Sequence, residues 1–122
     1  MSSAEVDVHQ ICLEKTDLND DIVYSSLTNE ETPLDSEVGV FFACVWHMKN
    51  VMDDYGKINM ENLQKFTESE LGTFRDLTDA EKSIIQSKLT ECKLVPRSKQ
   101  EETAIIIKNC HMNLVVNMFK SL

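Results

Sequence analysis

The most apolar part of the chain is the segment SEVGVFFACVWHMKNVM, which runs from Ser36 to Met52. Between Val38 and Met48 its only ionisable side chain is His47. The segment is long for a β-strand and has no interior proline, so its pattern predicts a helix. Because apolar side chains surround nearly the whole of this helix, it must be buried on most of its faces. We therefore expect the remaining chain to pack around it.

Apolar residues at helical spacing predict five further helices on the two sides of this segment. The chain has only three glycines and two prolines, which disfavours a β-rich fold with many tight turns. A polar loop is expected over residues 28–35, and a connector that carries Phe74 over residues 71–76. The predicted helices cover residues 3–14, 18–27, 36–54, 59–68, 78–93 and 98–119. The fold class is thus all-α, a six-helix bundle in a single domain of residues 1–122.

Helix-start signals support several of these boundaries. Three segments fit the capping box, in which a hydroxyl and a carboxylate three residues later satisfy the free N–H groups of the first turn. They begin at Ser2, Thr78 and Ser98, and Asn59 is a further candidate cap. Gly56 is well placed for the left-handed residue that follows the central helix.

The chain is acidic, with a net charge of −9 from 21 acidic and 12 basic residues. This disfavours nucleic acid, whose binding depends on cationic contacts with phosphate, and electrostatic docking on an anionic membrane. No run of about 18 apolar residues is present, so no segment is predicted to span a bilayer. The first residues, MSSAEVD, lack the basic and apolar segments of a signal peptide. This leaves either a cytosolic protein or a mature chain whose signal has been removed.

Four cysteines are widely spaced at Cys12, Cys44, Cys92 and Cys110. They form no CxxC pair of the kind that zinc sites and redox motifs use. In an extracellular domain an even set of four indicates two disulfides, for which three pairings are possible. Spacing alone favours secretion but does not choose among the pairings.

The helices and cysteines together resemble the insect odorant-binding protein family. The segment FFACVWHMKNVMDDYGKINMENL is similar to that family's third helix, glycine turn and fourth helix, and EETAIIIKNC to the stretch before its last cysteine. Six cysteines of the family pair first with third, second with fifth, and fourth with sixth. Val40 and Glu101 stand where the second and fifth would be, so the chain looks like the four-cysteine "minus-C" subgroup. The resemblance implies the disulfides Cys12–Cys44 and Cys92–Cys110.

The resemblance also implies an extracellular carrier that encloses a small hydrophobic ligand, such as an odorant, a pheromone or a fatty acid. A chemosensory receptor is then a candidate partner, a monomer or weak homodimer is expected, and no cofactor is needed. Phe42 and Trp46, on either side of Cys44, and Ile107, before Cys110, point at the ligand by this resemblance. The candidate ligand-binding residues are Val8, Phe42, Trp46, Met52, Ile58, Leu63, Phe66, Phe74, Leu89, Ile107, His111, Leu114 and Phe119.

Each candidate also has a plainer interpretation. The apolar residues form a core as readily as a cavity wall, although pockets for small molecules are mostly apolar with a few polar groups. His111 follows Cys110 directly, at a position that often borders the pocket in the family that the chain resembles. It can therefore hydrogen-bond a ligand or titrate near pH 6. A partly exposed histidine without a role fits that position equally well.

Metal and catalytic sites are disfavoured. Cys44 with His47, and Cys110 with His111, are irregularly spaced for zinc, and the implied disulfides use both cysteines. An EF-hand loop with Gly56 in sixth place would need acidic residues at positions occupied by Val51 and Asn62. The sequence has no Gly-rich phosphate loop, GxSxG or paired His/carboxylate motif, so catalysis is not expected.

Two further functional hypotheses stay open. In one, the chain is a helical protein-interaction module whose apolar surface docks a partner. In the other, it is a reduced cytosolic bundle with four free thiols. An internal cavity argues against the first, and paired cysteines argue against the second.

Overall fold

The computed structural model describes residues 7–28, 30–73 and 75–121, and over this part the chain is helical apart from its connections. An isolated antiparallel bridge joins Met52 and Ile58. The predicted all-α, six-helix fold is confirmed. The helices are α1 (Val8–Thr16), α2 (Asp20–Ser26), α3 (Gly39–Met48), α4 (Met60–Gly72), α5 (Asp79–Glu91) and α6 (Gln100–Ser121).

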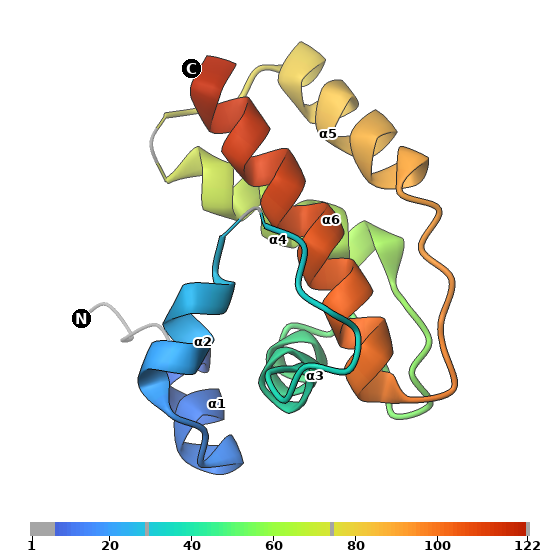
Figure 1. Ribbon diagram of the computed structural model, residues 1–122. Helices are drawn as coiled ribbons and strands as arrows, with labels where there is room; N and C mark the ends of the chain where they lie inside the picture. Colours follow the sequence, from blue (N-terminus) through green and yellow to red (C-terminus); the bar gives the residue numbers. More distant parts are fainter. Residues whose placement is uncertain (1–6, 29, 74, 122) are drawn as a thin grey trace, which may run out of the picture.

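Helix α3 lies at the centre, between α1 on one side and α6 on the other (Figure 1). Its Phe41, Phe42, Val45 and Trp46 are all buried, as the apolar pattern predicted. Helix α4 lies behind α6, and α5 runs alongside α6 at the edge of the molecule (Figure 1). In the described part of the chain, no helix is long and apolar enough to cross a membrane.

Side-chain caps begin most of the helices. Asn59 accepts the backbone N–H of Asn62 at 2.9 Å, and Thr78 forms the predicted capping box with Glu81. The Ser98 box does not start α6, which begins at Gln100; the hydroxyl of Thr103 instead accepts the N–H of Arg97 at 2.8 Å. The predicted box at Ser2 lies outside the described residues.

The prediction that the central helix extends to residue 54 is wrong. Helix α3 ends at Met48, and Asn50 takes a left-handed conformation with a φ of 59°. The N–H groups of Val51 and Met52 then donate to the carbonyl of Trp46, at 2.8 and 3.2 Å. A loop that folds back therefore buries the side chains of Val51 and Met52. In the sequence this loop shows the same apolar pattern that a longer helix would show.

Other boundaries also move. Gly56, with a φ of 81°, lies in the turn between the bridged residues Met52 and Ile58 and does not follow a helix directly. Helix α1 begins at Val8, after an Asp7 cap, and the predicted start at residue 3 lies outside the described residues. Helix α4 continues to Gly72 and includes residues assigned to the connector.

The two disulfides are those that the family resemblance implied. Cys12–Cys44 joins α1 to α3 with a Cα–Cα distance of 5.7 Å. Cys92–Cys110 joins the end of α5 to α6 with a Cα–Cα distance of 6.1 Å. The hypothesis of a bundle with four free thiols is therefore wrong for this structure.

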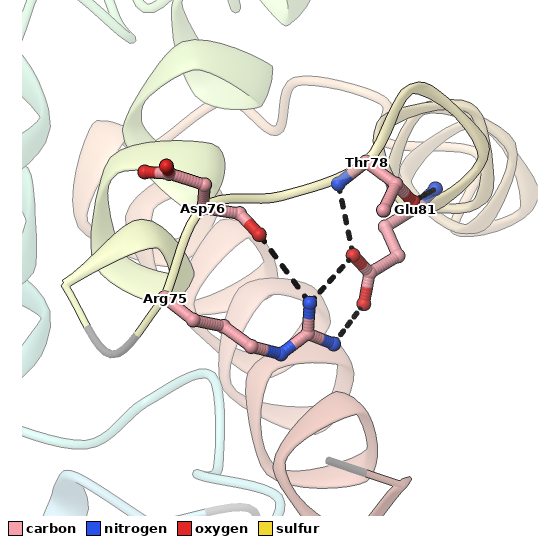
Figure 2. A network of polar contacts seen from close by, with 4 residues as sticks. All are labelled: Arg75, Asp76, Thr78 and Glu81. Atoms are coloured by element: carbon pink, nitrogen blue, oxygen red, sulfur yellow. Dashed lines mark hydrogen bonds and ion pairs between the residues drawn. The ribbon is translucent and has the colours of Figure 1, made fainter.

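The connection from α4 to α5 is held by a polar network (Figure 2). The guanidinium of Arg75 donates to both carboxylate oxygens of Glu81, and to the carbonyl of Asp76 at 3.3 Å. Glu81 also accepts the N–H of Thr78 at 2.9 Å. The Arg75 hydrogen bond, followed by the Thr78 backbone bond, lowers the pKa of Glu81 to about 2. The carboxylate that caps α5 is therefore ionised at any mildly acidic pH.

The first turns of α3 and α6 meet where the family's third disulfide would be. A Cβ added to Gly39 would lie 2.9 Å from both the Cβ and the backbone oxygen of Glu101, closer than such atoms normally approach. Val40, next along the chain, is exposed. Close helix contact at a glycine thus takes the place of the missing covalent link.

We expect Gly39→Ala to lower the free energy of unfolding by about 1–3 kcal/mol, because α3 and α6 must separate to admit the methyl group. Gly72→Ala is the matched control, since a Cβ there meets nothing within 4 Å. That helical substitution should leave stability unchanged or raise it by up to about 1 kcal/mol. Urea unfolding measures both; equal values for the two variants would contradict the close contact.

Candidate functional site

A pocket of about 200 Å³ opens between α3, α4 and α6, with α1 and the end of α2 at its border. It brings together four of the predicted ligand-binding residues: Phe42, Trp46, Phe66 and His111. Six residues that were not predicted complete it: His9, Leu27, Val45, Glu70, Lys108 and Met112.

Three rings form the main wall of this pocket. Trp46 meets Phe66 edge-on, with centroids 5.4 Å apart, and meets His111 edge-on at 5.8 Å. Phe66 and His111 are 5.0 Å apart at a tilt of 33°. Each ring thus contacts the other two, and edge-to-face pairs of this kind stabilise by about 0.5–1.5 kcal/mol beyond area burial. The wall is fixed in shape before any ligand arrives.

Trp46 is also held from behind. Its indole Nε1–H donates to the carbonyl of Ala104 on α6 at 3.0 Å, which satisfies the one polar atom of a side chain that is 2% exposed. Two residues earlier on α3, Cys44 is bonded to α1. The indole is therefore held in place by α3, which is bonded to α1 through the disulfide and to α6 through the Trp46 hydrogen bond.

The hydrogen bonds of His111 identify its tautomer. Thr67 donates its hydroxyl hydrogen to the carbonyl of Leu63 at 2.9 Å, so its oxygen accepts from Nδ1 of His111 at 3.0 Å. The proton of the neutral ring is therefore on Nδ1. Nε2 keeps its lone pair and lies 3.9 Å from a carboxylate oxygen of Glu70.

His111 is neutral over the physiological pH range. Burial of the ring, and secondarily the positive charge of His9, lower its pKa to about 4. The expectation of a partly exposed side chain is wrong, because His111 is 4% exposed and lines the pocket.

The other predicted residues lie elsewhere. Val8, Leu63, Leu89 and Ile107 are buried in the core without lining this pocket. Met52 and Ile58 line a groove formed by residues 50–62. Leu114 borders a different pocket, and Phe119 is 41% exposed near the end of α6. Phe74 lies outside the described residues.

The pocket that Leu114 borders lies between α5 and α6 and is larger, at about 660 Å³. Its apolar strip of Ile84, Leu114 and Met118 is flanked by three asparagines and by charged residues. Ile84 is 45% exposed. We regard it as the weaker candidate despite its volume, because ligand sites are enclosed mainly by apolar and aromatic side chains. The smaller pocket meets that condition.

Lys108 is the most informative residue that the sequence analysis missed. It interrupts the apolar run AIIIKNC and was treated as part of that segment without a role. Ala104, Lys108, His111 and Val115 follow one another at helical spacing, and all four are buried. That spacing places a lysine on the inward face of the last helix, which is the signal that could have identified it.

The arrangement is suited to binding, and metal ligation finds no support in it. Both cysteines considered as zinc ligands are in disulfides. Among the described residues no group of three or more His, Cys, Asp or Glu side chains is placed to hold a metal ion.

We expect the buried neutral His111 to make stability depend on pH. Between pH 6.5 and about 4 the ring is protonated in the unfolded chain and neutral in the fold, so stability falls as the pH falls. The loss from this one group is about 3 kcal/mol, complete near pH 4. Urea unfolding of the wild type and of His111→Asn at several pH values measures it.

The matched variant keeps an N–H donor for Thr67 and cannot titrate. Its stability should therefore fall less over that interval, while titration of the carboxylates affects both proteins alike. Parallel pH profiles would contradict the low pKa of His111.

Comparison with known proteins agrees with the geometry. A model of the PBP/GOBP family, whose members are carriers of small ligands, matches residues 3–113. No significant match was found among curated proteins or among solved structures. The match spans α1 to α5 and α6 up to residue 113, and it includes all four cysteines. The chain therefore belongs to the PBP/GOBP family of odorant-binding proteins, and it is a four-cysteine, minus-C member of that family.

Proposed function

We propose that this protein is an extracellular carrier that binds a small hydrophobic molecule in the pocket walled by Trp46, Phe66 and His111. The observation that carries the proposal is this pocket itself, in which three mutually packed rings and Phe42 from three helices face one apolar space. Ligands of this kind include odorants, pheromones and fatty acids. Binding is burial without chemical change of the ligand.

The size of the pocket limits the ligand. Its volume of about 200 Å³ corresponds to roughly seven water molecules. It lies below the range of about 300–1,000 Å³ that is usual for drug-sized ligands. Each buried methylene contributes about 0.8 kcal/mol, so a medium alkyl chain of about ten carbons is needed to reach micromolar affinity, about −8 kcal/mol. A longer chain would have to extend through the open side.

Two disulfides support an extracellular location, since such bonds persist in oxidising compartments. They also leave fewer covalent restraints than three, which favours a deformable pocket and broad selectivity. A chemosensory receptor as recipient of the ligand, and a monomer or weak homodimer, are expectations of the family resemblance.

The only tryptophan of the chain gives a direct test. We expect aliphatic alcohols and esters to change the emission of Trp46 saturably, with micromolar dissociation constants, because the indole forms part of the wall. Phe66→Ala should weaken binding by about tenfold or more, since it removes the ring that packs against Trp46. Ile84→Ala, in the other pocket, is the matched control and should bind as the wild type does.

The control separates the two pockets. Weaker binding by the Ile84 variant, with normal binding by the Phe66 variant, would place the ligand between α5 and α6. No response of Trp46 to any of a panel of lipids and volatile compounds, and no displacement of an apolar fluorescent probe, would argue for the protein-interaction hypothesis instead.

A further inference from the structure

Lys108 is a cation buried in the pocket wall of an acidic protein. Of the lysines and arginines in the described part of the chain it is the buried one, at 1% exposed. It lies on α6, one turn after Ala104, whose carbonyl holds Trp46, and one turn before His111. The lysine thus lies on the face of α6 that lines the pocket.

The ammonium group is incompletely paired. Its Nζ donates to the carbonyl of Glu30 at 3.0 Å and to the hydroxyl of Thr32 at 2.6 Å. An ammonium has three N–H donors, and the described residues offer no third acceptor. Neither do they form an ion pair with it, because every salt bridge among them involves other residues. The negative charge that acts on the ammonium group is that of Glu30, whose side chain is exposed.

A buried cation without a counter-ion is unfavourable. Removing an ammonium from water costs several kcal/mol unless a carboxylate and further hydrogen bonds compensate. Burial accordingly lowers the pKa of Lys108, and the charge of Glu30 opposes this only in part. A negatively charged group entering the pocket would therefore gain a partner that the protein itself does not supply.

The other charged groups of the pocket orient such a ligand. Glu70 lines the same space, but its side chain is 42% exposed, so it belongs to the solvent side. His9 is likewise exposed, and His111 is uncharged at neutral pH. Negative charge is thus repelled by the exposed Glu70 and attracted by the buried Lys108, while the apolar tail can lie along Trp46 and Phe66.

We propose that Lys108 makes this pocket selective for amphiphilic anions, that is, small apolar molecules that carry a carboxylate. The inference rests on the proposed carrier function and specifies its ligand class. The head group accepts the free N–H of Lys108, and the alkyl tail contacts the ring wall. Charge-assisted hydrogen bonds of this type are shorter and stronger than neutral ones.

Three ligands with the same eight-carbon chain test this on the wild-type protein: octanoate, octanol and methyl octanoate. Each is titrated at neutral pH with Trp46 emission as the readout. We expect octanoate to bind about tenfold to a hundredfold more tightly than the other two, the range for a hydrogen bond to a charged group. The ester keeps the acceptor oxygens without the charge, so its weaker binding identifies charge as the cause.

Two lysine variants locate the effect. Lys108→Met keeps the length of the side chain and should abolish the preference for octanoate while leaving octanol affinity within about threefold. Lys65→Met is the matched control, because it removes the same charge from an exposed side chain on α4. It should keep the full preference. The octanoate-to-octanol ratio is the readout, since a general loosening of the fold would weaken both ligands together.

Each outcome decides the question. Equal binding of acid, alcohol and ester to the wild type would overturn the selectivity proposal and leave the carrier function intact. A preference that survives in Lys108→Met, or is lost in Lys65→Met, would overturn the role of Lys108. No binding of any of the three would reject the carrier function and this inference with it. If Lys108→Met does not fold, the wild-type comparison alone decides the ligand class.

Discussion

The burial of α3 is the constraint on which the rest of this structure depends. An apolar helix of ten residues cannot be stable in water, so the chain has to cover it on several sides. Cys44 ties it to α1, Trp46 hydrogen-bonds α6, and Gly39 brings the first turns of α3 and α6 into contact. The pocket results from this arrangement. Rings from α3, α4 and α6 pack against one another and leave a space on one side.

Local patterns predicted the fold well where the signal was itself local. Asn59 and Thr78 start helices because their side chains bond amides three residues away, and such contacts can be inferred from spacing. The disulfide pairing was not local, and it was accessible only through the family resemblance. Of the predicted site residues, Phe42 and Trp46 share the pocket because they are one helical turn apart on α3.

The differences between the sequence predictions and the structure have physical causes. The end of α3 was misplaced because a loop that donates two N–H groups to Trp46 buries Val51 and Met52 as fully as a helix would. Ile107 and Leu63 were assigned to the pocket because an apolar side chain in the core and one in a cavity wall look the same in sequence. Lys108 was overlooked because its partners, Glu30 and Thr32, come from a distant segment.

The two sulfur bridges differ in their access to solvent, and this has a consequence for how the protein responds to reduction. Cys12 is completely buried and its partner Cys44 is partly buried, whereas Cys92 is exposed at the end of α5. Thiol–disulfide exchange requires an attacking thiolate to reach a sulfur atom, so Cys92–Cys110 is the bridge that opens first. Helix α5 contributes no side chain to the ring-walled pocket. Mild reductant therefore loosens α5 at one edge of the molecule and leaves the Cys12–Cys44 disulfide and the ring-walled pocket in place.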